Sequence, residues 1–253
     1  MSLPSRPSQC RNVLTNDIIG AAGAQRHGAI LTFMGAARLG REVKTLDHAW
    51  REFRANRSPK VIALAILAAA ALRIALGGFT YADAIAAVAM IAVYPFGEWA
   101  IHVYLLHAKP FRLRGRRVEL PSSAAHREHH ERPNYLGLIL LAPLEAAALL
   151  LLAVPVVLAV FAIFLPVGAL VTAAFAGYVL IGVYEWTHFL IHTAYRPRSA
   201  AYRAIWRNHR LHHFKNEHYW HGITNTVADH VLRTAPDQKD VPRSRTARTL
   251  QSL

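Results

Sequence analysis

The chain of 253 residues carries 29 Lys and Arg against 15 Asp and Glu, a net charge of +14, yet 53% of its residues are hydrophobic. One cysteine, Cys10, excludes an internal disulfide framework. The first 60 residues are polar and basic, so we expect no cleavable signal peptide. The basic residues lie in segments separated by apolar runs and contain no recognisable binding module, which argues against nucleic acid as a partner.

Four apolar stretches predict four membrane-spanning helices. The first runs from about Val61 to Phe79, with Arg73 near its far end, where the side chain can snorkel, and the second from about Ala82 to Leu106. The tract from Leu136 to Ile191 is too long for one span, and Pro166-Val167-Gly168 divides it. A span needs about 20 mostly apolar residues, and such runs are rare in soluble folds. We therefore expect an all-α integral membrane protein; a soluble helical protein with a very apolar core is the alternative.

The basic residues set the orientation. Ten precede Val61, seven lie between His107 and Leu136, and eleven follow His192, whereas the two connections 77–83 and 164–168 carry none. This positive-inside pattern predicts a multi-pass protein with both termini cytoplasmic. Its preference for Arg and Ala points to a bacterial inner membrane. The charge would also hold the protein to anionic headgroups.

The sequence predicts that the chain divides into three parts. Residues 1–60 form a basic N-terminal segment in which Leu46, Trp50 and Phe53 recur at helical spacing, as in an interfacial helix; a helix packed on the domain is the alternative. Residues 61–236 form the four-span domain with its cytosolic cap, including a helix from about 200 to 214. Residues 237–253 are expected to be a disordered basic tail.

Ten of the fifteen histidines fall into four spaced groups. By the charge argument all four emerge on the cytoplasmic side, where they would form a metal site. Neutral imidazole suits Zn, Cu, Fe and Ni, so the spacing does not name the metal. The ten are His102, His107, His126, His129, His130, His188, His192, His209, His212 and His213.

The spacing favours a pair of ions over a single one. His188 and His192, four apart, share a helical face. The adjacent histidines of each His-x-x-His-His group diverge by about 100° on a helix of 3.6 residues per turn, so they address two different ions. His102 and His107, five apart, do not share a helical face, and we expect the helix to unwind near Lys109-Pro110.

Other polar residues lie beside these groups. Glu98 and Glu185 each stand about one turn before a histidine pair, and we expect them to orient an imidazole; a polar contact between spans is the alternative. A surface role is expected for His218 and His221; helping to close the site or meeting the electron donor is the alternative.

The four histidine groups resemble those of the fatty acid hydroxylase/sterol desaturase superfamily, and within it the fatty acid 2-hydroxylases, over roughly residues 95–236. The surrounding motifs add to the resemblance: His107-Ala108-Lys109-Pro110, Tyr184-Glu185-Trp186-Thr187-His188, His212-His213-Phe214, and Gly222-Ile223-Thr224 followed by Asp229.

The resemblance implies a four-span membrane fold whose cytosolic cap holds two metal ions, iron in the working enzyme and zinc in some purified members. Five histidines would serve each ion. The first set is His102, His107, His126, His130 and His212, and the second is His129, His188, His192, His209 and His213. The resemblance also implies catalytic roles for Tyr184, Glu185 and Asp229.

The activity implied is O2-dependent hydroxylation of a C–H bond in a lipid from the bilayer, most often an acyl chain. Residues 1–60 lack the His-Pro-Gly-Gly motif of a haem domain, so electrons are expected from a separate ferredoxin or cytochrome b5-like protein. The family commonly has Asp where Glu185 stands and Trp where this chain has Ala228. Tyr219, Trp220 and His221 also stand just before the Gly-Ile-Thr segment. Because the departures outside residues 1–60 could reshape substrate entry, the chain length and head group of the substrate stay open.

Two alternatives remain. A lipid, sterol or carotenoid desaturase or hydroxylase of the same superfamily would use the same chemistry, although carotenoid enzymes usually space the third histidine pair by four residues rather than the three found here. The second alternative, which is not an enzyme, is a membrane metal transporter or sensor. A transporter, however, would place histidines at several depths along its spans.

Overall fold

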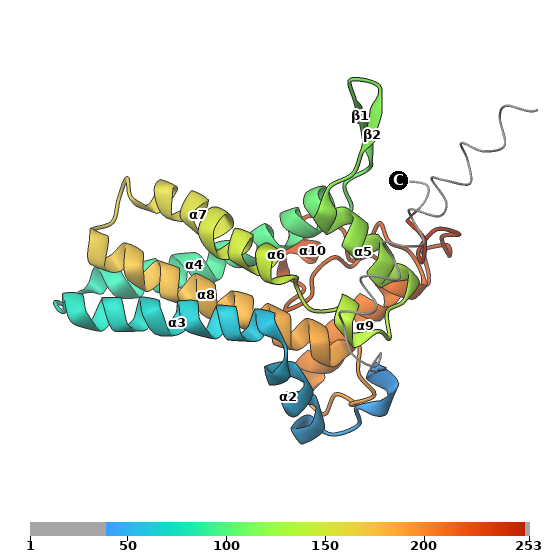
Figure 1. The fold of residues 1–253 in the computed structure, drawn as a ribbon, viewed down its shortest axis with the longest axis horizontal. Helices are drawn as coiled ribbons and strands as arrows, with labels where there is room; N and C mark the ends of the chain where they lie inside the picture. Colours follow the sequence, from blue (N-terminus) through green and yellow to red (C-terminus); the bar gives the residue numbers. More distant parts are fainter. Residues whose placement is uncertain (1–38, 251–253) are drawn as a thin grey trace, which may run out of the picture. The chain divides into compact units, whose positions relative to one another are not determined.

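The computed structural model describes residues 39–250, which are mostly helical (Figure 1). Most of the predicted N-terminal segment lies outside the described residues. In chain order the elements are η1 (Gly40–Glu42), α2 (Leu46–Ala55), α3 (Arg57–Leu76), α4 (Tyr81–Ala100), η2 (Ile101–Leu106), β1 (Phe111–Leu113), β2 (Arg116–Val118), α5 (Pro121–Glu131), η3 (Leu136–Leu138), α6 (Pro143–Ala148), η4 (Leu149–Ala153), α7 (Val154–Phe161), α8 (Val167–Ile191), α9 (Ala200–Phe214) and α10 (Val227–Val231).

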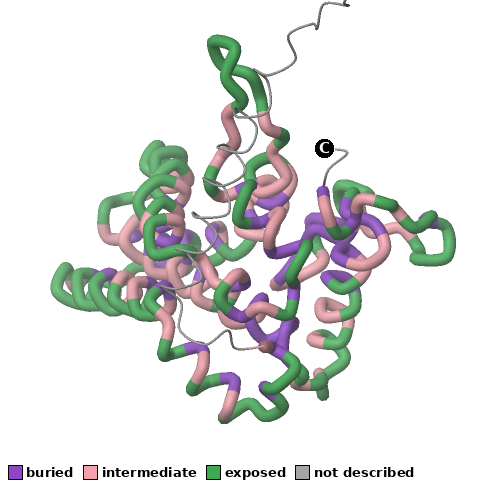
Figure 2. The backbone as a smooth tube through the Cα atoms, turned by 45° about the vertical axis from the view of Figure 1, so that its right-hand side comes forward, coloured by how far each residue is buried: buried purple, intermediate pink, exposed green. Residues whose placement is uncertain are grey.

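Four helical stretches are long and apolar enough to cross a membrane: Arg57–Leu76, Tyr81–Leu106, Leu136–Phe161 and Val167–Ile191. Exposed residues run along much of these helices (Figure 2). Many are large and apolar; on α3, for example, Leu64 and Ile74 are 69% and 71% exposed. A soluble helix would bury such a face, because exposing it to water is unfavourable. The expected four-span, all-α membrane fold is confirmed.

Helix α8 packs against α3 on one side and α4 on the other. Small buried residues of α8, Ala169, Ala173 and Gly177, allow this close approach. A Cβ at Gly177 would lie 3.4 Å from Val154 and 3.5 Å from Met90. The small residues therefore set how closely α8 approaches the helices around it.

A buried ion pair joins three helices at the end of the bundle away from α5 and α9 (Figure 1). Arg73 Nε donates to Asp83 Oδ1 at 2.7 Å, and Thr172 Oγ1 donates to the same oxygen at 2.5 Å. Arg73 also donates to the Gly77 carbonyl at 2.6 Å. The side chain is 6% exposed, so the snorkelling expected of Arg73 is wrong. Asp83 and Thr172 offer partners that compensate for its burial.

Helix α2 begins at Leu46, where the Thr45 hydroxyl accepts a hydrogen bond from the His48 N–H at 3.2 Å. Phe53 is buried, with its ring 5.1 Å from Trp186 of α8. Trp50 remains 51% exposed. One face of the helix therefore packs on the domain, while the other stays open.

The segment after Asp237 differs from the disordered tail expected there. Val241, Ala247 and Leu250 are buried, and the Leu250 carbonyl accepts a hydrogen bond from Arg127 of α5 at 2.6 Å. The three apolar residues are too widely spaced to form a periodic pattern. Their burial and the backbone contacts with α5 order residues 237–250 against the cap.

Candidate metal centre

The ten histidines meet at one end of the helix bundle, where α5 and α9 lie (Figure 1). They form two groups, and within each group one ring nitrogen per histidine lies within 4.8 Å of the others. This is the five-and-five division that the resemblance implied. Group 1 is His102, His107, His126, His130 and His212, and group 2 is His129, His188, His192, His209 and His213.

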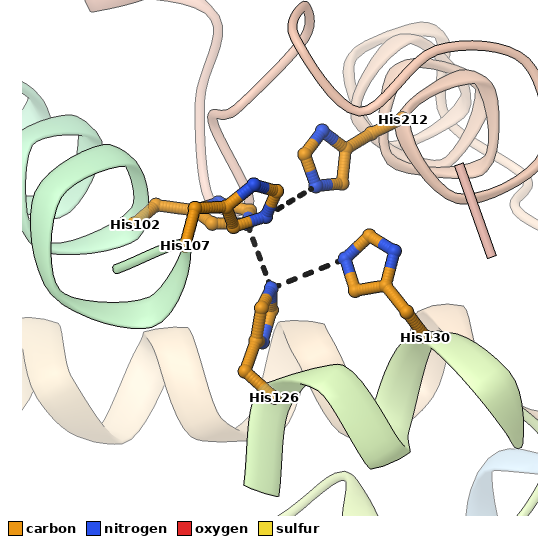
Figure 3. Close-up of side chains that lie close together, drawn as sticks. All are labelled: His102, His107, His126, His130 and His212. Atoms are coloured by element: carbon orange, nitrogen blue, oxygen red, sulfur yellow. Dashed lines mark hydrogen bonds between the residues drawn. The ribbon is translucent and has the colours of Figure 1, made fainter. Parts of the chain in front are cut away.

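In group 1 the imidazoles point toward one another from η2, α5 and α9 (Figure 3). His126 Nε2 lies 3.2 Å from His102 Nε2 and 3.1 Å from His130 Nε2. His212 Nε2 lies 3.2 Å from His107 Nε2. Five ring nitrogens therefore surround a common point.

Backbone carbonyls fix the tautomer of three of these rings. His102 Nδ1 lies 2.6 Å from the His221 oxygen, His130 Nδ1 lies 2.8 Å from the Ala247 oxygen, and His212 Nδ1 lies 2.8 Å from a further carbonyl, that of Tyr219. A carbonyl only accepts, so each Nδ1 carries the proton in the neutral ring. Each Nε2 then presents a lone pair to the centre of group 1, which is the tautomer a metal ligand needs.

A π-helical turn brings His102 and His107 together. The His107 N–H donates to the His102 carbonyl at 3.1 Å, five residues back, and the two rings are 5.0 Å apart. The expectation that they do not share a face is wrong, because it assumed 3.6 residues per turn. A π turn contains more residues than a turn of regular α-helix, so residues five apart lie on the same side of the helix. The turn ends at Leu106, before the expected break at Lys109-Pro110.

Group 2 joins α5, the end of α8 and α9. His209 Nε2 lies 3.0 Å from both His192 Nε2 and His213 Nε2. The His129 ring lies 4.9 Å from that of His188 and 4.5 Å from that of His192. Both ring nitrogens of His129 and of His188 are buried without a hydrogen-bond partner among the described residues.

Adjacent histidines separate into different groups. His129 and His130 leave α5 toward group 2 and group 1 respectively, and His213 and His212 do the same from α9. The rings of His130 and His213 stack at 4.0 Å, so the two groups are in contact. The divergence expected from helical geometry therefore places two potential ion sites side by side.

Burial keeps these rings neutral. It lowers the pKa of His130 to about 4 and holds the pKa of His126, His129, His209 and His213 well below 6.5. Neutral imidazole with a free lone pair is the form that binds a metal. The fully buried groups would not become protonated at neutral pH.

The donor set fits two cations. Converging lone pairs repel one another unless a cation lies between them, and each buried polar atom left without a partner costs about 1–3 kcal/mol. The unpaired nitrogens of His129 and His188 would gain such a partner. Imidazole-rich coordination suits iron and zinc.

Two buried carboxylates hold the loop that supports His102. Asp229 accepts hydrogen bonds from the His221 N–H at 3.0 Å and the Gly222 N–H at 2.7 Å. Glu98 accepts from the Ile223 N–H at 2.5 Å. A Cβ at Gly222 would lie 2.0 Å from the Asn225 oxygen, so glycine is required for this close approach. The loop thereby holds the His221 carbonyl against His102.

The second glutamate also binds backbone. Glu185 accepts from the Ser58 hydroxyl and from the Leu141 N–H at 3.0 Å. Neither glutamate makes a hydrogen bond to an imidazole within residues 39–250, so the expected direct orientation of a histidine is wrong. Each carboxylate instead accepts a hydrogen bond from a backbone N–H outside the regular helices: Glu98 from Ile223 and Glu185 from Leu141. Tyr184 places its ring 5.7 Å from that of His188.

The surface role preferred for His221 from the sequence is wrong. Its side chain was expected at the surface, but the residue is 4% exposed and its ring lies 5.4 Å from His102 and 5.2 Å from His212. His218 is half-exposed, as expected. The useful signal was the position of His221 directly before Gly222-Ile223-Thr224, the segment that packs on η2 and α4.

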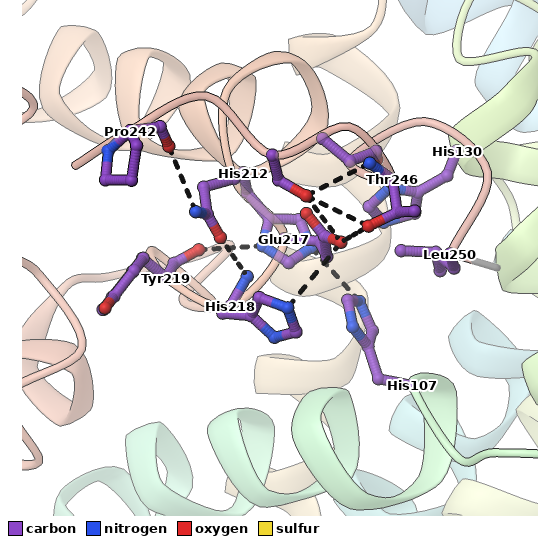
Figure 4. A network of polar contacts seen from close by, with 12 residues as sticks. His107, His130, His212, Glu217, His218, Tyr219, Pro242, Thr246 and Leu250 are labelled. Carbon is purple, nitrogen blue, oxygen red and sulfur yellow. Dashed lines mark hydrogen bonds and ion pairs between the residues drawn. The ribbon is translucent and has the colours of Figure 1, made fainter. Parts of the chain in front are cut away.

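A polar network ties the C-terminal segment to group 1 (Figure 4). Glu217 is fully buried and accepts hydrogen bonds from the hydroxyls of Ser244 at 3.0 Å and Thr246 at 2.6 Å. The next turn of the segment places the Ala247 carbonyl on His130. Residues 244–247 therefore position a group 1 ring from outside the four spans.

Comparisons with known proteins agree with this arrangement. A family model described as fatty acid hydroxylase matches residues 87–234. The chain is 27% identical over 154 residues to dihydroceramide fatty acyl 2-hydroxylase FAH2 of Arabidopsis thaliana, covering 60% of this chain and 63% of that protein. The match thus spans less than two thirds of the relative.

A solved structure described as full-length Scs7p, with only its hydroxylase domain visible, superposes with a TM-score of 0.56 at 18% identity, covering 74% of this chain and 68% of that one. At this identity the likeness shows the fold. The family match covers more than half of the sequence and includes all ten clustered histidines. The chain belongs to the fatty acid hydroxylase family.

Proposed function

We propose that the chain is a di-iron, O2-dependent hydroxylase that acts on the acyl chain of a lipid. The observation that carries the proposal is the pair of five-imidazole groups at one end of four apolar helices. The net reaction converts R–H, O2, two electrons and two protons into R–OH and water. The family match and the 2-hydroxylase relative support a C–H bond next to the acyl carbonyl as the target.

Groups 1 and 2 would each hold one iron ion, with zinc able to replace iron in purified protein. Bound there, the pair of ions would supply O2 activation and the redox chemistry that oxidises an unactivated C–H bond. The chain's own part is to hold ten neutral rings in place and to keep water out. The carbonyls of His221, Ala247 and Tyr219 orient three of the rings.

The three side chains implied as catalytic take different roles in this proposal. Asp229 and Glu185 are positioning residues, since each binds loop N–H groups. Tyr184, beside His188, is the one available to contact substrate. The substrate would arrive from the bilayer, and a separate ferredoxin or cytochrome b5-like protein would supply electrons.

Lipid mass spectrometry tests the reaction. Cells that express the chain should contain lipids heavier by one oxygen atom, and cells that express His213→Ala should not. Loss of two hydrogens instead would identify a desaturase. Metal uptake without a changed lipid would identify a transporter and refute the enzymatic proposal.

We further propose that both termini and the segment between α4 and η3 face the cytoplasm of a bacterium, with α2 in the headgroup region of its inner membrane. The exposed Trp50 and the basic residues of these segments support this orientation. Reporter tags at both ends and at Gly115, in the hairpin turn, should all report cytoplasmic. A periplasmic signal from Gly115 would reverse the topology.

A further inference from the structure

A basic cavity of 910 Å³ opens between the end of α8 and the first three turns of α9. Four arginines line it, Arg196, Arg203, Arg207 and Arg210, together with aromatic residues that include Trp206. No acidic residue lines it in the described part of the chain. A concave, arginine-lined surface favours an anionic partner.

The arginines are free to meet such a partner. All four are exposed, and none forms an ion pair within residues 39–250. Arg210 lies over the Trp206 ring at 4.8 Å, which holds its guanidinium at the cavity wall. A neighbouring cavity adds Lys44 and Arg198, so the positive surface continues beyond the first opening.

Residues that line the cavity are next to group 2 histidines in the chain. Thr193, which lines it, follows His192 in the chain, and Arg210 follows His209. Trp206 precedes His209 by three residues on α9, so the two are neighbours on the helix surface.

We propose that this cavity is the docking site for an acidic protein that carries single electrons, such as an iron–sulfur or b-type haem protein. The inference rests on the proposed hydroxylase function, which consumes two electrons per product. Two successive encounters would each oxidise one carrier and reduce the centre by one electron. Electron tunnelling slows steeply with distance, which favours docking beside group 2 over docking elsewhere on the cap.

Charge reversal tests the site directly. The variant is Arg203→Glu/Arg207→Glu, and its matched control is Arg112→Glu/Arg117→Glu on the exposed β1–β2 hairpin, which changes charge by the same amount (Figure 1). Each protein is placed in nanodiscs of neutral lipid. Binding of two probes, a soluble acidic [2Fe–2S] ferredoxin and the soluble domain of cytochrome b5, is measured against ionic strength.

We expect the cavity variant to bind the probe carrier about 10-fold or more weakly at low salt, with a shallower salt dependence, while the hairpin variant binds like the parent. Metal content and thermal midpoint should match the parent in both variants. In assays of product formation, the cavity variant should raise the KM for the carrier and leave kcat little changed.

Several outcomes would overturn the proposal. These are unchanged binding of both carriers by the cavity variant, an equal loss in the hairpin variant, or no binding of either carrier to the parent. A defect confined to nanodiscs with anionic lipid would assign the cavity to headgroups instead. Because binding is measured without turnover, a chain that binds the carrier but forms no product would refute the hydroxylase proposal and not the docking site.

Discussion

Gly222→Ala is the sharpest test of how the loop supports group 1. The added Cβ would lie 2.0 Å from the Asn225 oxygen, so the loop must move by about 1 Å to reach even a tight contact of about 3 Å. The adjacent His221 carbonyl lies 2.6 Å from His102 Nδ1. The same movement along that line would lengthen the contact to about 3.6 Å, which is no longer a hydrogen bond.

Loss of the partner that orients a ligand typically weakens metal affinity by about 10–100-fold. That range corresponds to about 1.4–2.7 kcal/mol of binding free energy. The assay is retention of metal by the purified variant against increasing chelator, with iron counted by mass spectrometry. We expect one ion per chain to be released at lower chelator concentration than in the parent, because group 2 makes no contact with Gly222.

Gly97→Ala provides the matched control. Gly97 lies in α4, one residue before Glu98, and a Cβ there meets nothing within 4 Å. In a helix this substitution stabilises by about 0.5–1 kcal/mol, so Gly97→Ala should fold and keep both ions. Equal chelator resistance of Gly222→Ala and Gly97→Ala would refute the role given to the His221 carbonyl.

Three further predictions concern single features of the centre. His130→Ala and His213→Ala should each abolish turnover and weaken metal binding in one group, whereas metal analysis of His230→Ala should match the parent. Burial lowers the pKa of His130 to about 4, so the unfolded metal-free chain binds more protons below pH 6.5. Stability, followed by thermal melts, should therefore fall as pH drops from about 6.5 toward 4; a flat profile would contradict this. Truncation after Arg243 removes the Ala247 carbonyl and should weaken metal binding about 10–100-fold in group 1, with group 2 intact.

Helical periodicity predicted much of the centre. The spans, the extent of α9 and the divergence of adjacent histidines all follow from regular geometry and apolar run length. These features depend on local pattern, which a single sequence displays. The five-and-five division also followed, but only through resemblance to a family.

Features of the centre that depend on tertiary contacts could not be predicted from periodicity. The π turn at η2 replaces regular helix hydrogen bonds with one from His107 to His102, and no residue pattern marks that change. The carbonyl of Ala247 reaches His130 across 117 residues of chain. Similarly, the polar composition after Asp237 suggested disorder, whereas contacts with α5 and Glu217 order that segment.

Metal stoichiometry and coordination test the central claim most directly. Iron-loaded protein purified in nanodiscs should contain two ions per chain. X-ray absorption should show coordination dominated by imidazole nitrogen, because groups 1 and 2 consist of histidines alone. His130→Ala and His213→Ala should each alter the environment of a different ion. A single ion per metal-replete chain, or coordination dominated by carboxylate oxygen, would contradict the two-group account.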